Sequence, residues 1–164
     1  TARMRALIFS DSHGDEENLR WMAELMSQRG PVDAYVHCGD GAQEFERVEN
    51  YLLALSPRAS IYGVRGNCDY FVNDVPWQRV MRLGGVNVLI THGHLQGVKT
   101  TLSLLPSAAR EMGCGVVLFG HTHRPTLEER DGILLMNPGT AQRGYAALLT
   151  VDEAGKAMGE LLSF

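Results

Sequence analysis

Short, largely apolar segments alternate with polar, glycine-containing loops in the first half of the chain. The apolar segment at 6–9 predicts a strand that is buried on both faces, and the segments at 34–37 and 61–64 predict two further strands. Between them, apolar residues spaced three or four positions apart at 19–26 and 45–55 predict two helices. This strand–helix–strand order is typical of βαβ units on a parallel sheet.

The second half of the chain is richer in predicted strands. Gly84 and Gly85 separate two apolar segments, 80–83 and 86–90, and a two-residue glycine turn predicts a β-hairpin. Helical spacing follows at 102–112. The remaining pattern predicts further strands at 116–119, 126–129, 133–136, 145–151 and 157–162. We expect an α/β protein with two packed sheets and helices outside them.

Composition limits the class of protein. The chain has 164 residues, of which 45% are hydrophobic and 21% charged, values typical of a folded globular protein. We expect a single domain over 1–164, and we set residues 1–3, ahead of Met4, aside as a cloning remnant. The net charge of −4, without a basic run, argues against an extended nucleic-acid surface.

Two further features indicate the cellular location. The sequence has no apolar run long enough to span a membrane and no signal-peptide pattern. Cys38, Cys68 and Cys114 are odd in number and form no Cys-x-x-Cys pair, which favours a reducing compartment over a disulfide scaffold. We therefore expect a cytoplasmic protein with no membrane partner.

Side chains that can bind metal follow the predicted strands. His121 and His123 come after an apolar strand, and alternation along a strand directs residues two apart to the same side. Across the chain the candidate ligands are Asp11, His13, Asp40, Asn67, His92, His121 and His123. These oxygen and nitrogen donors suit Mn²⁺, Fe²⁺ or Zn²⁺, and seven of them exceed the needs of one tetrahedral ion. Two adjacent ions fit better, and such centres catalyse phosphoryl displacement.

Each of these signals is weak alone. An Asp-x-His pair after a strand is more often a helix cap with a surface histidine, and Gly-Asp or Gly-Asn pairs are ordinary turns. Their joint occurrence at five predicted strand ends favours a metal site. His37 and Cys114, by contrast, are expected to be core residues. The sequence lacks the nucleophile-elbow, P-loop and dinucleotide-binding motifs.

The order of these motifs resembles that of the calcineurin-like metallophosphoesterase superfamily. The matching segments are Asp11-x-His13, Gly39-Asp40, Gly66-Asn67-Cys68-Asp69, His92-Gly93-His94 and Gly120-His121-x-His123. The short chain and its Asn-Cys-Asp variant look like the small bacterial and archaeal phosphodiesterase branch. The resemblance implies a four-layer α-β-β-α sandwich of two mixed sheets with the metals at the sheet edge.

The resemblance also implies ligand roles and a mechanism. Asp11, His13 and His123 would hold one ion, while Asn67, His92 and His121 would hold the other. Asp40 would bridge the two ions. A metal-bound hydroxide would attack phosphorus in line, and the metal ions and Asn67 would hold the phosphate oxygens.

One departure from the superfamily concerns the general acid. The protein-phosphatase branch has a histidine where this chain has Cys68. A thiol with an ordinary pKa of about 8.5 is a poorer acid, which favours diesters with good leaving groups over monoesters. Asp69 and His94 are alternative candidates for the acid.

Residues outside the ligand set are candidates for substrate contact. Arg65, Arg124 and Arg143 lie near motif ends and could contact phosphate, although exposed arginines are common without a ligand. Tyr70 and Phe71 could stack on a substrate base, but we expect them to pack in the core beside their loop.

The resulting hypothesis is a metal-dependent phosphodiesterase acting on a small phosphodiester. Mn²⁺ is the expected metal, with Fe²⁺, Ni²⁺, Zn²⁺ and Mg²⁺ as alternatives. A phosphomonoesterase of nucleotide or broad range is the alternative in the same class. A non-catalytic, protein-binding scaffold of the same fold is the alternative outside it, and a homo-oligomer is compatible with each of these.

Overall fold

Two five-stranded sheets form the centre of the fold. The computed structural model describes residues 3–72 and 74–164, so Thr1 and Ala2 of the predicted remnant lie outside the described residues. The first sheet, in the order β10-β9-β1-β2-β3, is built from β1 (Met4–Phe9), β2 (Ala34–His37), β3 (Ser60–Gly63), β9 (Tyr145–Val151) and β10 (Ala157–Ser163). The second, in the order β4-β5-β6-β8-β7, is built from β4 (Gln78–Leu83), β5 (Val86–Thr91), β6 (Val116–Leu118), β7 (Thr126–Arg130) and β8 (Ile133–Asn137).

Both sheets are mixed. β1, β2 and β3 run parallel, with Ile8 opposite Val36, whereas β9 pairs antiparallel with β1 and with β10. In the second sheet β5, β6 and β8 run parallel, and β4 and β7 are antiparallel edge strands. The predicted hairpin at Gly84-Gly85 is confirmed, because it joins β4 to β5.

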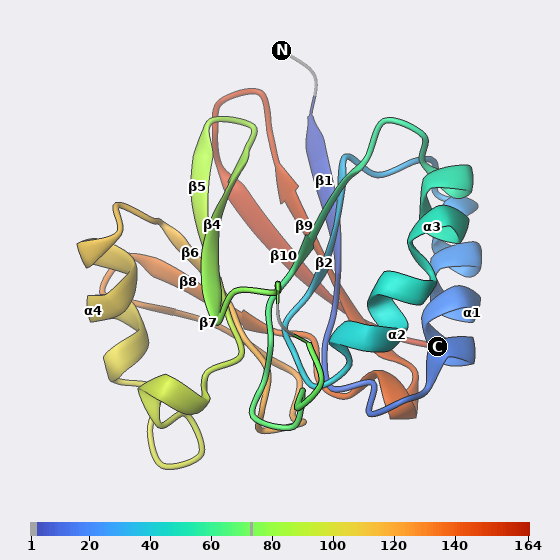
Figure 1. Cartoon of the computed structure of the whole chain (residues 1–164). Coiled ribbons are helices and arrows are strands. Elements are labelled where there is room, and N and C mark those ends of the chain that lie inside the picture. The colour runs from blue at the N-terminus through green and yellow to red at the C-terminus, as the bar shows by residue number, and fades with distance from the viewer. Residues whose placement is uncertain (1–2, 73) are drawn as a thin grey trace.

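Helices cover the outer faces of the two sheets. Figure 1 shows α1 (Glu16–Ser27), α2 (Ala42–Arg47) and α3 (Glu49–Leu55) outside the first sheet and α4 (Leu104–Glu111) outside the second. Alternate residues of β1 explain the layers: Ala6 and Ile8 join the core between the sheets, while Leu7 and Phe9 pack under the helices. The predicted four-layer α-β-β-α sandwich is confirmed.

The helices differ from the prediction at two places. The single helix predicted at 45–55 is two helices, because Val48 has φ −91° and ψ 0° and ends α2 while it begins α3. The bend still buries Phe45, Val48 and Leu52 in one core, so the apolar spacing alone did not reveal it. The helix predicted at 102–112 begins later, at Leu104, and carries Pro106 in its first turn, where proline is tolerated.

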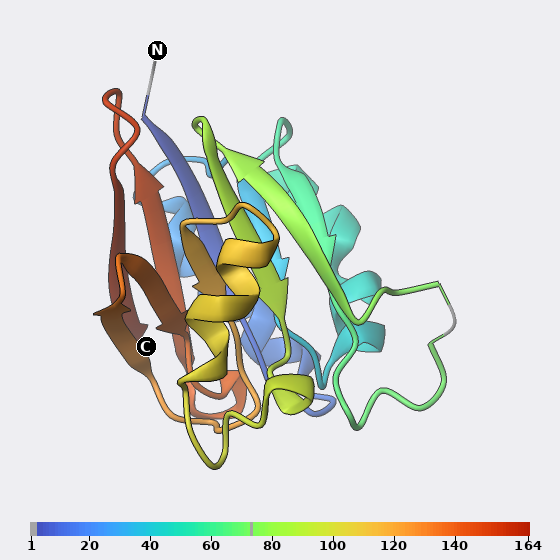
Figure 2. The same cartoon turned by 90° about the vertical axis from the view of Figure 1, so that its left-hand side faces the viewer.

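All six parallel strands deliver their carboxyl ends to one edge of the sandwich. In Figures 1 and 2 the loops that follow these strands gather at the lower end, opposite the β4–β5 hairpin. Ligand sites in open α/β sheets form beyond these carboxyl ends. Within the described residues, no helix is long and apolar enough to cross a membrane.

Candidate metal centre

Six of the predicted ligands converge at this edge as two groups of three. In the first group, His123 Nε2 lies 3.2 Å from both Asp11 Oδ1 and His13 Nε2. In the second group, His92 Nε2 lies 3.2 Å from Asp40 Oδ2 and 3.1 Å from His121 Nδ1. Within each group the ligand atoms lie within 4.8 Å of one another, close enough to share one ion.

The two carboxylates connect these groups. Asp40 Oδ2 lies 3.9 Å from His13 Nε2 in the first group, and Asp11 Oδ1 lies 3.9 Å from His92 Nε2 in the second. Lone pairs of both acids therefore face the space between the groups. A carboxylate in this position can contact two neighbouring cations, the role that the family resemblance implies for Asp40.

The buried Asp11 carboxylate tests whether a cation fits here. Oδ2 accepts hydrogen bonds from Ser10 Oγ at 2.5 Å and from the backbone N–H of His121 at 3.0 Å. Oδ1 is buried and has no hydrogen-bond partner among the residues that the structure describes. A buried acceptor without a partner is costly unless a ligand satisfies it, and a cation facing the two groups would do so.

His92 is fixed in the tautomer that binds metal. Its Nδ1 lies 2.7 Å from the carbonyl oxygen of Cys38 and must donate a proton there, which leaves the lone pair on Nε2. Gly39 makes this contact possible, because its φ is +101° and a Cβ would lie 2.8 Å from His92 Nδ1. The imidazole therefore directs its free nitrogen at Asp40.

Five of these ligands have the left-handed backbone conformation. Their φ angles run from 43° to 72°, and the residues are Asp11, His13, Asp40, His121 and His123. Left-handed residues other than glycine cost of order 1–3 kcal/mol each and gather at functional sites. The chain turns sharply at each strand end and presents the side chain at once, which strand alternation alone did not predict.

The family follows from comparison with known proteins. Residues 4–153 match the model of the calcineurin-like phosphoesterase superfamily domain. The chain belongs to this superfamily. A probable metallophosphoesterase, YsnB of Bacillus subtilis, is 40% identical over 158 residues, covering 92% of this chain and 87% of the relative. The phosphodiesterase YfcE of Escherichia coli is 32% identical over 154 residues, covering 84% and 79%.

Solved structures agree with this fold. A Streptococcus pneumoniae protein described as a predicted phosphoesterase superposes with a TM-score of 0.74 at 25% identity, covering 100% of this chain and 99% of that one. Vacuolar protein sorting 29 from Cryptosporidium parvum has a TM-score of 0.75 at 19% identity over 100% and 99% of the two chains. At that identity the second likeness shows the fold alone.

In this phosphoesterase, Asp69 anchors the loops that carry the ligands. Its carboxylate accepts the backbone N–H groups of Asp40 at 2.8 Å, Gly41 at 3.0 Å, Ala42 at 3.1 Å and Gly66 at 2.7 Å. Four backbone donors occupy both oxygens of this carboxylate and tie the loops to it. This geometry favours a positioning role for Asp69 over the role of general acid, and the sequence offered no signal that separates the two.

We expect Asp69→Asn to destabilise the protein by about 2–3 kcal/mol and to weaken metal binding about 10- to 100-fold. The amide loses the negative charge that the four N–H groups require and brings donors of its own. Asp152→Asn is the matched control, because Asp152 accepts two backbone N–H groups in the exposed β9–β10 turn. Urea unfolding and a Mn²⁺ titration measure the two effects, and equal behaviour of the two variants would contradict the anchoring role.

Further buried polar groups hold the ligand loops. Gly39 N–H donates to His37 Nδ1, so His37 Nε2 donates to Ser12 Oγ, which in turn donates to Glu44 Oε2. The prediction that His37 is a buried, satisfied histidine is confirmed. On the other side Thr140 Oγ1 donates to the carbonyl of Asp11. Glu44 and Thr140 carry no motif that the sequence reading could have used.

The three other predicted catalytic residues lie beside the cluster. Asn67 is exposed, and its Nδ2 lies 3.5 Å from Cys68 Sγ, while Cys68 N–H donates to Asp40 Oδ1 at 2.8 Å. Cys68 Sγ itself lies within 4.8 Å of ligand atoms of His13 and Asp40. Partial burial and the neighbouring Asp40 charge raise the pKa of the Cys68 thiol. His94 packs its ring 5.5 Å from that of His92, and its Nδ1 is buried without a partner in the described part of the chain.

The predicted arginines differ in their surroundings. Arg124 and Arg143 are exposed and line one surface pocket together with His123. Arg65 stacks on Trp77, with its guanidinium carbon 4.3 Å from the ring centre, and it donates to the carbonyl of Asp69. Arg124 and Arg143 are thus exposed beside the first ligand group, whereas Arg65 supports a loop.

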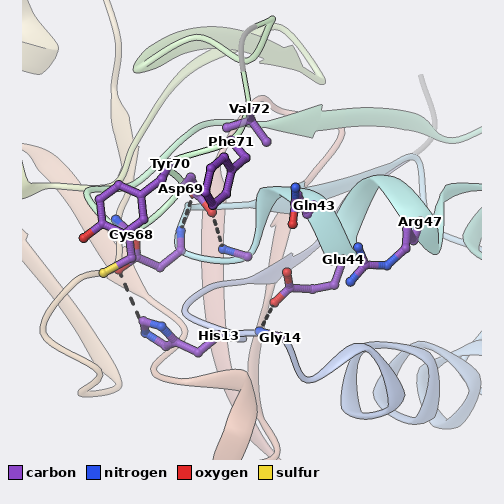
Figure 3. A pocket seen from close by; sticks show the side chains of 12 residues that line it. His13, Gly14, Gln43, Glu44, Arg47, Cys68, Asp69, Tyr70, Phe71 and Val72 are labelled. Carbon is purple, nitrogen blue, oxygen red and sulfur yellow. Dashed lines mark hydrogen bonds and ion pairs between the residues drawn. The ribbon is translucent and has the colours of Figure 1, made fainter.

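The prediction that Tyr70 and Phe71 pack in the core is wrong. They are 75% and 84% exposed, because the loop between β3 and β4 leaves the sheets before it reaches them. Figure 3 shows both rings beside a cavity of about 210 Å³ that His13 and Cys68 also line. Cys114, in contrast, is buried as predicted.

Charge in the metal-free centre is divided between ionised acids and basic imidazoles. Burial opposes ionisation of Asp11 and Asp40, but hydrogen bonds and the charges of neighbouring histidines lower the pKa of both carboxyls. The hydrogen bond to Asp11 raises the pKa of His13 above 6.5. Burial works against charge on His92, yet its bond to Asp40 and the nearby acids still raise its pKa. Burial and His92 lower the pKa of His121 to about 4.

Metal affinity should therefore fall as the pH drops through neutrality. Mn²⁺ needs unprotonated imidazoles, and the raised pKa values of His13 and His92 mean that protons compete already near pH 7. The acids and His121 stay deprotonated in that range and add no competition. Calorimetric titrations at pH 6 and pH 8 should show affinity weaker by at least about 10-fold at pH 6, with release of up to about two protons. Equal affinity at both pH values would contradict this.

Proposed function

We propose that the protein is a phosphodiesterase that works with two divalent metal ions. The observation that carries this proposal is the pair of ligand groups, each with one carboxylate and two imidazoles, connected through Asp11 and Asp40. A storage or sensor site would need only one such group. When bound, two adjacent ions supply a nucleophile at neutral pH and neutralise charge on the phosphate.

The residues of the chain then divide the remaining work. Asp11, His13 and His123 would hold one ion, and His92, His121 and Asn67 would hold the other, with Asp40 available to both. Arg124 and Arg143, beside His123, bind the non-bridging phosphate oxygens through charge-assisted hydrogen bonds. The strained backbone at five ligands would keep their side chains directed at the ions without rearrangement during the reaction.

The preference for diesters rests on the residue at position 68 and on the smaller negative charge of a diester. A thiol whose pKa is raised gives up its proton reluctantly, so the chain offers no efficient acid there for an alkoxide leaving group. A phenolate leaves without protonation, and a diester carries less negative charge than a monoester. We propose Mn²⁺ as the metal and the cytoplasm as the location; the three free cysteines support a reducing compartment.

Matched substrates test the diester preference. The Mn²⁺-loaded protein should hydrolyse bis(p-nitrophenyl) phosphate at least about 10-fold faster, in kcat/KM, than p-nitrophenyl phosphate. Both substrates release the same phenolate, so the comparison isolates the second ester group. A faster monoester would overturn the proposal in favour of a phosphomonoesterase.

Restoring an imidazole at position 68 should extend activity to poor leaving groups. We expect Cys68→His to raise kcat/KM for an alkyl monoester about 10- to 100-fold, because general acid catalysis is worth about 10²–10⁴ when the proton donor is well placed. Cys68→Ala removes the thiol without adding an acid, and it should give no such gain. A gain with Cys68→Ala, or none with Cys68→His, would contradict the role assigned to this position.

A further inference from the structure

The β3–β4 loop places two exposed aromatic rings beside the metal centre. Tyr70 and Phe71 follow directly after Cys68 and Asp69, and they are 75% and 84% exposed. A single exposed aromatic residue needs no explanation, but two adjacent ones at the rim of a reaction centre offer apolar faces for a ligand.

The cavity under these rings is continuous with the metal centre. Its lining includes the predicted ligands His13 and Asp40, together with Cys68, and its volume is about 210 Å³. Figure 3 shows the rings of Tyr70 and Phe71 on one side and the side chains of Glu44 and Arg47 farther along. A group bonded through oxygen to a phosphorus atom at the metal centre can therefore reach the aromatic rings.

Polar groups of this cavity indicate what kind of ring fits. Glu44 is occupied by Ser12 and Gly14, and Arg47 is paired with Glu16. Gln43 is exposed, and its amide makes no hydrogen bond within the described part of the chain. An amide both donates and accepts, as the edge of a nucleobase does, whereas an aliphatic group would use neither the amide nor the aromatic faces.

We propose that Tyr70 and Phe71 form an aromatic clamp that selects phosphodiesters carrying a flat aromatic or heteroaromatic group. The ring of one ester branch stacks on the clamp, and the phosphate remains between the metal ligands and the arginine pocket lined by Arg124 and Arg143. This inference rests on the proposed phosphodiesterase function, because it assigns the substrate class of that same centre. Base–aromatic stacking is sequence-tolerant, so Gln43 supplies the discrimination between a nucleobase and a plain aryl ring.

Binding of two phosphonates that cannot be hydrolysed tests the clamp. Calorimetry on the Mn²⁺-loaded protein should show phenylphosphonate binding about 10-fold or more tightly than ethylphosphonate, since stacking on one ring is worth roughly that factor. Tyr70→Ala and Phe71→Ala should remove most of this ratio while ethylphosphonate binding stays the same. Phe71→Leu keeps the apolar bulk but should also lose the phenyl-to-ethyl affinity ratio, whereas Tyr70→Phe should retain that ratio.

Controls separate the clamp from the metal centre. Met158→Ala removes an exposed apolar side chain from β10 and should leave the phenyl-to-ethyl ratio unchanged. Equal affinity for the two phosphonates in a protein that turns over bis(p-nitrophenyl) phosphate would overturn the clamp alone. If the Tyr70→Ala/Phe71→Ala double variant kept the phenyl-to-ethyl affinity ratio, the clamp would also be overturned. Absence of turnover with any divalent ion would instead overturn the proposed function.

Binding of thymidine 5′-monophosphate distinguishes a clamp for nucleobases from a clamp for plain aryl groups. Tighter binding than phenylphosphonate, with loss of that gain in Gln43→Ala, supports a clamp for nucleobases. If the two ligands bind equally, if Gln43→Ala leaves their binding unchanged and if the Tyr70→Ala/Phe71→Ala double variant loses it, the result supports a clamp for plain aryl groups. Thymidine 5′-monophosphate that binds no better than ethylphosphonate, and is unaffected by the double substitution, would overturn a clamp for nucleobases.

Discussion

Asp40→Asn should reduce the turnover of bis(p-nitrophenyl) phosphate by at least about 10³-fold, because metal ions contribute several kcal/mol to this chemistry and each 1.4 kcal/mol is a factor of ten. Asparagine has the same size and also tolerates the left-handed backbone that Asp40 adopts at φ 57°. Its oxygen can still accept the N–H of Cys68 in place of Oδ1. The substituted amide nitrogen would then face His92 and His13, where a cation must bind.

A matched control exists in a turn away from the ligands. Asp131 also has a left-handed backbone, at φ 52°, but it lies in the β7–β8 turn away from the ligands. Asp131→Asn should therefore keep full activity. Circular dichroism should show the same fold for both variants, and equilibrium dialysis should show lost Mn²⁺ only in Asp40→Asn. Full activity of Asp40→Asn would contradict the shared-ligand role.

Removal of the metal should lower the melting temperature by about 8–16 °C. Free Mn²⁺ at 1,000 times its Kd stabilises the folded state by about 4 kcal/mol, and for a chain of this size each kcal/mol shifts Tm by about 2–4 °C. The metal-free centre keeps two acids close together, leaves Asp11 Oδ1 unsatisfied and retains five strained ligands. Cation binding relieves the first two costs and offsets the third.

Differential scanning calorimetry with and without Mn²⁺, after chelation and removal of the chelator, measures this shift. Asp40→Asn should melt with little dependence on Mn²⁺, because it has lost the shared carboxylate. Asp131→Asn should retain the full shift. A wild-type Tm that does not respond to Mn²⁺ would contradict a cation site built from these residues.

Much of the centre could be predicted because every ligand except Asn67 follows a strand whose last residues are buried on both faces. Such strands are recognisable without an alignment, and their parallel order places Asp11, Asp40 and His92 at one edge. Strand alternation did not place the pairs at two-residue spacing, because they lie beyond the strand ends, and His121 and His123 join different ligand groups. The sequence did not predict the left-handed backbone at His121 and His123, since nothing in a histidine's type requires it.

The structure adds most where local pattern and tertiary packing diverge. Asp69 stands in a catalytic motif, yet its carboxylate is surrounded by four backbone N–H groups that come from residues up to 29 positions away. Tyr70 and Phe71 have core-forming side chains, but they lie on a loop with no periodicity to show which way they point. Val48 fits a continuous helical pattern and still separates two helices.

The most direct test is a titration of the metal-free protein with Mn²⁺ in which bound metal and bis(p-nitrophenyl) phosphate hydrolysis are measured on the same samples. A two-metal phosphodiesterase predicts that activity rises to a plateau as the second equivalent binds. If Mn²⁺ and every divalent ion used in its place bind tightly but give no turnover, the enzymatic account is contradicted, and a metal-binding protein of the same fold remains.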